Sequence, residues 1–441
     1  MAAKVVFTPL FGGDGCSLLS AAPAPNLELA GYTDTEFAVS GTAHGLTADG
    51  GVDEAGFTTR IVVRRPQAAT DFNGTVVTEW LNVSSGADGA PEYTYLAAEL
   101  VRGGYAWVGV SAQYDGVEGS TGSVGLSRPG PKSLAGKDPE RYGTLHHPGD
   151  AYCYNIFDLV GRHLRATDTP SHPLGGLTVD KVLAVGESQS AMALTTFVTT
   201  FRSTTFDGFL IHSRAAAQLP LGAIGAGIDV DATFLGDPVT IPGDVTAPVF
   251  IVQTETDVLT NFQFHRARQA NTERVRTWEI AGSAHADHFQ IGPYEEYLGC
   301  PDPVNRGQQR FVLRAALSHL CGWVADGTAP PLASPLELTG DEPTFRTDDV
   351  GNVRGGVRTP SVDAPTQVLT GIVKDPVSRI CLLFGATGAI PPTDLIARYG
   401  SHEGYLDAYT AAVDRSIAEG FVLEADRVEI LADAHPELLG E

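Results

Sequence analysis

The stretch KVLAVGESQSAM, from Lys181 to Met192, decides the fold class. Its first half is a β-branched run typical of a buried strand, and an apolar run typical of a helix begins near Ser190. Between them lies GESQS, which matches the G-x-S-x-G turn that exposes a serine between a strand and a helix, except that Ser190 replaces the last glycine. We interpret Ser188 as a candidate nucleophile, although a bare G-x-S-x-S match also occurs by chance.

The sequence around this turn alternates strand-like and helix-like segments. Upstream, GTVVTEWL (74–81) and YAWVGVS (105–111) are typical of buried strands, and PEYTYLAAELVRGG (91–104) is typical of a helix with an early proline and terminal glycines. The alternation predicts an α/β fold with a mostly parallel sheet covered by helices on both faces. The further predicted elements are a helix at 151–165, strands at 206–212, 248–253 and 274–280, and a helix at 306–326.

Both ends of the chain depart from this alternation. Residues 1–70 are predicted to be β-rich, and residues 330–347 to form a linker. Apolar side chains recur every four residues over 405–417, which predicts an amphipathic helix that needs a partner surface. We therefore predict a catalytic domain over 1–335 and a C-terminal segment over 336–441 that packs on it. The predicted N-terminal strands lie at 4–9, 36–41 and 57–65.

A serine nucleophile needs a base and an acid that orients the base. In this fold they follow in the order serine, acid, histidine. QTETD places Glu255 and Asp257 just beyond a buried strand, and WEIAGSAH places His285 in a loop after the next strand. We predict a triad of Ser188, Asp257 and His285. Glu255 stays an alternative acid, because residues two apart in an extended segment point the same way.

The oxyanion of an acyl-transfer reaction needs preorganised N–H donors. One donor is expected to be the backbone amide of Gln189, at the start of a helix. The second is expected from the loop WLNVSSG, at Val83 or Ser84 with Asn82 close by, although this loop is also explained as a plain connection.

Two long loops are expected to form pocket walls or a cap. They span 114–150 and 215–246, and both follow predicted strands. Tyr114 and Arg214 are candidate substrate-binding residues within or beside them, and either is equally explained as structural. His212, at the end of FLIH, is expected to be structural or to line the pocket.

Composition excludes several classes of partner. The chain has 53 acidic and 29 basic residues, which gives a formal charge of −24. Nucleic acids and anionic membrane surfaces attract clustered Lys and Arg, so neither is expected as a partner. The oligomeric state is not predicted.

The cysteines and the N-terminus indicate in which cellular compartment the protein is expected. Five cysteines are scattered without a C-x-x-C pair, a pattern that predicts neither a disulfide framework nor a zinc site. The N-terminus lacks an apolar h-region, and no segment approaches the ~18 apolar residues of a membrane span. A cytoplasmic location is the expectation.

Several blocks together resemble the bacterial "α/β hydrolase domain-containing" esterase-like family. The resemblance covers nearly the whole chain and implies an α/β-hydrolase fold, a triad at Ser188, the TETD segment and His285, and hydrolysis of carboxylic esters without a cofactor. The blocks are EWLNVSSGADGAPEY, LHHPGDAYCYNIFDLV, GESQSA, FLIHSR, QTETDV, WEIAGSAHAD, RAALSHLCGWVADGTAPP and GNVRGGVRTPSVDAP.

The predicted function is a serine carboxylic-ester hydrolase that acts through a covalent acyl-enzyme on a small-molecule ester. No metal or cofactor is expected. Within the same chemistry, an acyltransferase or a lactonase is the alternative. A non-catalytic binding protein on the same fold is the alternative of another class, and the presence of all three triad residue types disfavours it.

Overall fold

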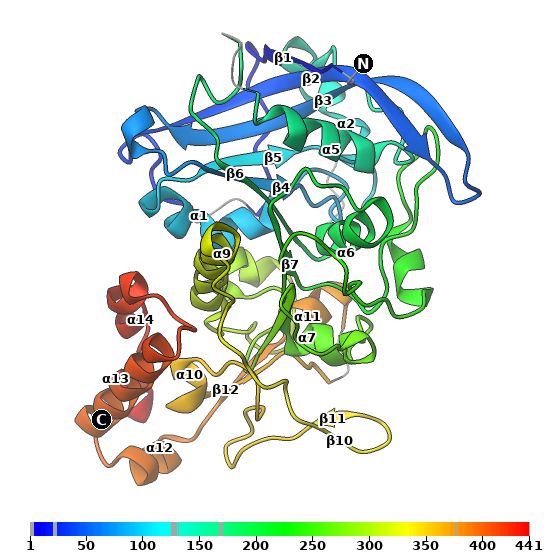
Figure 1. Ribbon diagram of the computed structural model, residues 1–441. Helices are drawn as coiled ribbons and strands as arrows, with labels where there is room; N and C mark the ends of the chain where they lie inside the picture. Colours follow the sequence, from blue (N-terminus) through cyan, green and yellow to red (C-terminus); the bar gives the residue numbers. More distant parts are fainter. Residues whose placement is uncertain are drawn as a thin grey trace. The chain divides into compact units, whose positions relative to one another are not determined.

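The computed structural model describes residues 4–440, except 21–23, 125–129, 131, 167–170 and 375–376. The chain forms two compact units, residues 1–249 and residues 250–441 (Figure 1). This division lies within the predicted catalytic domain, and the predicted boundary near residue 335 stays a prediction.

The first unit is built on one sheet with the strand order β1-β2-β3-β5-β4-β6-β7. Strands β4 to β7 run parallel, and β1, β2 and β3 extend the sheet in antiparallel fashion beyond β5. The predicted α/β fold with a mostly parallel sheet is therefore confirmed. The strands are β1 Val6–Pro9, β2 Tyr32–Leu46, β3 Val52–Pro66, β4 Thr75–Trp80, β5 Ala106–Val110, β6 Lys181–Glu187 and β7 Gly208–His212.

Helices cover both faces of this sheet. Neighbouring strand residues point to opposite faces, and the side chain of Glu79 accepts from the amide of Tyr93 in α1, while the ring of Trp80 packs on Phe157 of α5. Pro91 begins α1, as predicted, because its missing N–H costs nothing in the first turn. The helices are α1 Pro91–Arg102, α2 Tyr114–Glu118, α3 Leu134–Lys137, α4 Pro139–Tyr142, α5 Cys153–His163 and α6 Gln189–Thr196, with shorter turns η1 Ala69–Asp71, η2 Phe197–Phe201 and η3 Val230–Leu235.

The β-rich N-terminal part is a long hairpin of β2 and β3, drawn in blue in Figure 1. Both strands are longer than predicted, because glycines that interrupt the sequence pattern stand inside them. A Cβ at Gly45 would lie 2.8 Å from the ring of Tyr152, and one at Gly41 would lie 3.1 Å from the ring of Phe57. These glycines make room for aromatic rings and do not end the strands.

The second unit begins within β8 (Val249–Thr254), whose neighbour in the sheet is β9 (Val275–Ile280). The predicted helix at 306–326 forms as α9 Gln309–Asp326, and residues 306–308 stay outside it. The other elements are α7 Glu255–Leu259, η4 Phe264–Ala267, α8 His288–Ile291, η5 Gly292–Tyr297, β10 Leu338–Thr339, β11 Thr344–Phe345, α10 Pro360–Asp363, β12 Gln367–Thr370, α11 Arg379–Phe384, β13 Ala386–Ala389, α12 Pro392–Tyr399, α13 His402–Ala418, η6 Glu424–Asp426, α14 Arg427–Ala432 and η7 Pro436–Leu439.

The C-terminal segment packs on α9 within this unit. The predicted amphipathic helix forms as α13, and its apolar stripe joins a buried cluster that includes Phe311 of α9. Arg314 of α9 adds a buried ion pair at 2.9 Å to Asp426 and a partly exposed one at 2.5 Å to Glu429. The predicted linker is also packed, since Trp278 donates to the carbonyl of Pro331.

A disulfide joins Cys300 to Cys381, with the Cα atoms 5.5 Å apart. The expectation that the cysteines form no disulfide framework is therefore wrong for this pair. An odd count and scattered spacing do not reveal a bond between residues 81 positions apart, because the fold alone brings them together. Cys16, Cys153 and Cys321 are not part of a disulfide.

Candidate active site

Ser188 occupies a strained turn between β6 and α6. Its backbone has φ 63° and ψ −121°, a conformation that costs a non-glycine residue about 1–3 kcal/mol. The amide of Ser188 donates to the carbonyl of His212 at 2.9 Å, which ties the turn to the end of β7. The side chain is half-buried, while its neighbours Glu187 and Gln189 are buried. The turn therefore presents one hydroxyl at the carboxyl end of the parallel strands.

The small residues around Ser188 let the strand and helix approach each other. A Cβ at Gly186 would lie 2.9 Å from the Cβ of Ser190 and 3.3 Å from Leu194. Gly186 is therefore required. Ser190 can replace the last glycine of the motif because its close neighbour is Gly186, which has no side chain.

The loop after β4 lies beside the serine turn, as the sequence predicted. Asn82 donates from Nδ2 to the carbonyl of Glu187 at 3.0 Å and accepts the amide of Ser84 at 2.8 Å. The amide of Val83 donates to Oε1 of Gln189 at 3.3 Å. The Ser84 amide is thus held inside its own loop, whereas the longer bond of Val83 leaves it the better candidate for the second oxyanion donor.

A buried hydrogen-bond network that the sequence did not reveal holds the side chain of Gln189. Nε2 of Gln189 donates to Oε1 of Gln113, which also accepts from Nε1 of Trp80 at 3.0 Å. Gln113 in turn donates to Asp150 at 3.2 Å. Burial raises the pKa of Asp150 to about 7. No sequence motif marks Gln113, because its partners come from separate strands and loops.

In the second unit, His285 pairs with Asp257. Nδ1 of His285 lies 2.6 Å from Oδ1 of Asp257, and both side chains are buried. The other carboxylate oxygen of Asp257 accepts from the amide of Thr254 at 2.8 Å and from its hydroxyl at 2.7 Å. The centroid of the Phe262 ring lies 4.4 Å from the centroid of the imidazole ring. This arrangement fixes the carboxylate and directs Nε2 of the imidazole away from it.

Glu255, the alternative acid, faces other partners. Its carboxylate accepts from the amide of Gly282 at 2.6 Å and from that of Gly371 at 2.8 Å. It therefore joins the segment that precedes His285 to the C-terminal segment. Burial raises the pKa of Glu255 to about 7, and the two amide donors oppose this shift.

Residues at the start of α9, just before it and in the C-terminal segment hold the His285 loop, and the sequence pattern does not reveal them. Nδ2 of Asn305 donates to the carbonyl of Gly282 at 3.2 Å, and Nε2 of Gln309 donates to that of Ala284 at 3.1 Å. The amide of Ala286 donates to the carbonyl of Leu383, in the helix that carries Cys381. A Cβ at Gly307 would lie 2.4 Å from the carbonyl oxygen of Gly282, so a glycine is needed there.

The two candidate substrate-binding residues have structural partners. Arg214 is fully buried, and its guanidinium donates to the carbonyls of Ala215, Ala216 and Val239. It therefore organises the 215–246 loop, and a contact of Arg214 with substrate stays a prediction. Tyr114 is half-buried at the start of α2, and its amide donates to Asp150 at 2.6 Å.

The two predicted wall loops pair with each other within the first unit. Asp150 accepts the amide of Ile228 at 2.8 Å, and the amide of Ala151 donates to the carbonyl of Ala223 at 3.0 Å. Residues 125–129 and 131 of the 114–150 loop lie outside the described residues. A role of these loops as a cap stays a prediction.

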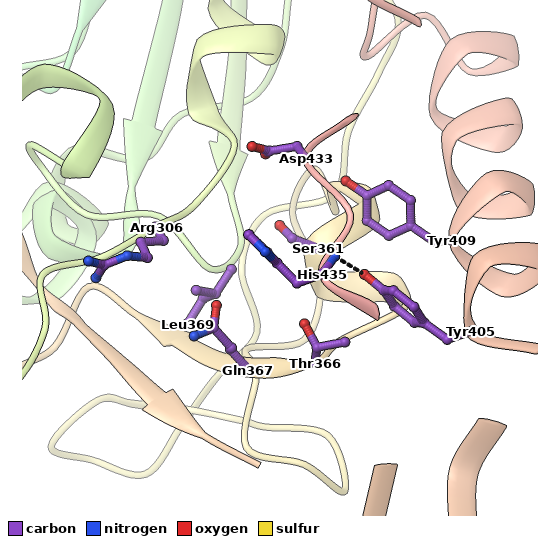
Figure 2. A pocket seen from close by; sticks show the side chains of 9 residues that line it. All are labelled: Arg306, Ser361, Thr366, Gln367, Leu369, Tyr405, Tyr409, Asp433 and His435. Carbon is purple, nitrogen blue, oxygen red and sulfur yellow. Dashed lines mark hydrogen bonds between the residues drawn. The ribbon is translucent and has the colours of Figure 1, made fainter. Parts of the chain in front are cut away.

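Two hollows of the described structure lie apart from these residues. Figure 2 shows one in the second unit, a polar cavity of about 20 Å³, which is the size of a single water and too small for an ester. In it the amide of His435 donates to the hydroxyl of Tyr405 at 3.1 Å. A larger hollow of about 640 Å³ lies in the first unit, between the end of the β2-β3 hairpin and residues 221–224. Ser188 lines neither of them.

Among the described helices, none combines the length and apolar character that a bilayer-spanning segment requires.

No curated protein sequence matches the chain. An esterase from Pyrococcus furiosus is 12% identical with a TM-score of 0.31, and the match covers 65% of this chain and 94% of that one. Est1E from Butyrivibrio proteoclasticus is 10% identical with a TM-score of 0.32, over 64% and 99% of the two chains. Neither likeness is close enough to support a statement about activity.

A family model described as an alpha/beta hydrolase domain matches residues 6–432. This match covers both units, the serine turn, the His285 loop and most of the C-terminal segment. The fold class and the family resemblance predicted from the sequence are thereby confirmed. The chain belongs to the alpha/beta hydrolase domain family.

Proposed function

We propose that the protein is a serine carboxylic-ester hydrolase in which Ser188 is the nucleophile, His285 the general base and Asp257 the acid that orients the base. The observation that carries the proposal is the pairing of His285 Nδ1 with Asp257 Oδ1 at 2.6 Å in a chain that also holds Ser188 on a strained turn. Family membership supports it, because the order of the three residues is that of the α/β-hydrolase triad.

In the proposed reaction, Nε2 of His285 takes the proton of the Ser188 hydroxyl as Oγ attacks the ester carbonyl. The alcohol then leaves with that proton and an acyl-enzyme remains. Water, deprotonated by the same nitrogen, attacks the acyl group and releases the acid. The charge of Asp257 stabilises the imidazolium that forms in both steps. Its second oxygen accepts two hydrogen bonds from Thr254, which hold the carboxylate in position.

The oxyanion is proposed to be bound by the backbone amides of Gln189 and Val83. Gln189 is the first residue of α6, where N–H groups have no partner within the helix and the helix dipole favours negative charge. Val83 already donates toward the same residue, through a bond of 3.3 Å that an oxyanion would replace. Two such donors contribute roughly 10²–10³ in rate each.

The test is a set of p-nitrophenyl esters of increasing acyl length, together with a fluorophosphonate probe. We expect hydrolysis of at least one ester and one fluorophosphonate adduct on Ser188, found by peptide mass spectrometry. Ser188→Ala serves as the control and should lose both. A protein that stays unlabelled and hydrolyses no ester would support the non-catalytic alternative and overturn the proposal.

A further inference from the structure

Three buried side chains meet on the face of the first unit's sheet that α1 covers. Glu187 and His212 are the last residues of β6 and β7 and are direct partners in the parallel register. Paired residues of neighbouring strands project to the same face, and Glu92, in the first turn of α1, lies over them. Each of the three offers one ligand atom, and these atoms all lie within 4.8 Å of one another. All three side chains are almost fully buried.

Two atoms of this cluster have unmet bonding capacity. Nδ1 of His212 lies 2.9 Å from Oε2 of Glu92. Within the described part of the chain, neither Nε2 of His212 nor Oε1 of Glu92 has a hydrogen-bond partner, although both atoms are shielded from solvent. Leaving a buried polar atom without a partner costs about 1–3 kcal/mol, and more where the group is charged. A buried neutral imidazole that faces a carboxylate can bind a metal ion at a ring nitrogen in place of a proton.

Two further ionisable residues lie on this side of the sheet. A third buried acid, Glu79, is held by the amides of Glu92 and Tyr93 at the start of α1 and by Nε1 of Trp107, so its oxygens are occupied. Burial, with the nearby Glu92, raises its pKa well above the ordinary range. Arg64, a cation on this side of the sheet, stacks on the ring of Tyr93 and pairs with Asp34. One divalent cation would balance the charge of Glu92 and Glu187.

We propose that Glu92, Glu187 and His212 bind one divalent transition-metal ion. One imidazole nitrogen with two carboxylates is a ligand set that suits Zn²⁺, Co²⁺, Mn²⁺ or Fe²⁺, whereas Mg²⁺ and Ca²⁺ prefer oxygen ligands alone. The site is structural, because its ligands are buried and no substrate reaches them. It does not depend on the proposed esterase activity.

The ion would fix the backbone that carries Ser188. Glu187 directly precedes Ser188, and the carbonyl of His212 accepts the Ser188 amide at 2.9 Å. Joining Glu187, His212 and Glu92 therefore ties the ends of β6 and β7 to α1 behind the strained turn. A site this deep is filled during folding, so metal binding contributes directly to the stability of the folded state.

The test is to unfold the full-length protein in denaturant with a chelator and to refold it with or without Co²⁺. We expect one equivalent of cobalt by elemental analysis after desalting, visible d–d absorption, and a Tm at least about 5 °C above that of the metal-free protein. His212→Gln and Glu187→Gln should abolish retention of the ion. His172→Gln is the matched control, since His172 is a buried histidine of the same unit whose two ring nitrogens face backbone partners. It should bind cobalt as the wild type does.

Two outcomes would overturn the proposal. One is wild-type protein that retains no cobalt and has the same Tm with and without it. The other is equal retention by wild type and His212→Gln. If His212→Gln does not fold, the cobalt-loaded wild type decides the question: a hyperfine-shifted imidazole N–H proton resonance is expected, and its absence would rule out a histidine ligand.

Discussion

The serine turn and the histidine loop are stabilised in different ways. Ser188 depends mainly on its own motif and on neighbouring strands, since Gly186 permits the close approach of strand and helix, and the strand register supplies the carbonyl of His212. His285 depends on distant parts of the chain, because Glu255, Asn305 and Gln309 hold its loop through backbone groups. A motif therefore reveals a residue whose geometry is local, and it does not show what holds a loop in place from afar.

The largest expected effect concerns the proposed nucleophile and the proposed general base. Ser188→Ala and His285→Ala should each lower kcat for ester hydrolysis by on the order of 10⁵, and the double variant should be little worse, because the residues act as a unit. Circular dichroism and Tm should stay near wild type for Ser188→Ala. Additive losses in the double variant would show that Ser188 and His285 act independently.

The next effect separates the two acids of the QTETD segment. Asp257→Asn should lower kcat by about 10³–10⁴, because the imidazole loses its orienting carboxylate and the charge that stabilises the imidazolium. Glu255→Gln should keep kcat within about tenfold of wild type, since its carboxylate faces Gly282 and Gly371 and not the imidazole. Steady-state kinetics on one ester decide between them. A large loss in Glu255→Gln with a near-normal Asp257→Asn would exchange the two roles.

Sequence reasoning reached the parts of the molecule that have a periodic or motif signature. The strand and helix alternation, the serine turn and the amphipathic α13 follow from side-chain patterns, and the structure confirms these elements. The sequence leaves Glu255 as an alternative to Asp257, because both follow the same strand. In the structure, the short helix α7 turns Asp257 toward Thr254 and His285, while Glu255 faces Gly282 and Gly371.

Other features have no signature that a single sequence shows. Gln113 reaches Gln189 because β4, β5 and β6 lie side by side, and Cys381 reaches Cys300 through the packing of the C-terminal segment. The glycines of β2 end the predicted strand too early, since their role is visible only once Phe57 and Tyr152 pack against them. Contacts between residues that lie far apart in the sequence thus account for most of the features that the sequence does not predict.

A smaller effect tests the network behind the serine turn. Gln113→Met should lower kcat by about 10–10² with KM little changed, because the side chain of Gln189 loses the group that positions it. The matched control is Gln308→Met, another buried glutamine, which holds Tyr409 and Asp433 in the second unit. The control should lose stability but keep kcat. Equal effects of both substitutions on kcat would remove Gln113 from the positioning of the site.

The disulfide tests the support of the histidine loop. Cys300→Ser should lower the free energy of unfolding by about 2–4 kcal/mol, since the bond constrains a long loop of the unfolded chain. Reduction of the wild type should produce the same loss, measured by urea unfolding with and without reductant. The labelling of Ser188 by fluorophosphonate should slow only modestly, as Asp257 and Asn305 still hold the His285 loop. An unchanged free energy of unfolding after reduction would show that the disulfide does not stabilise the folded protein.

The smallest expected effect is the pH dependence that Glu255 gives to folding. Burial raises its pKa in the folded protein to about 7, above the ordinary value of 4.5, so the folded state binds the proton more tightly than the unfolded chain does. The stability from this group is therefore complete below about pH 4.5 and is lost as the pH rises toward 7.

Glutamine cannot titrate, so the stability of Glu255→Gln should lack this contribution. The free energy of unfolding of wild type relative to the variant should fall between pH 5 and pH 7 and stay level above about pH 7.5. Urea unfolding at fixed ionic strength measures the difference, and Glu140→Gln, at an exposed acid of α4, controls for a change of charge alone. The competing effect is that of the two amide donors, Gly282 and Gly371, which favour the carboxylate. A wild-type advantage that grows with pH would mean that these hydrogen bonds outweigh burial and that Glu255 is ionised in the folded protein.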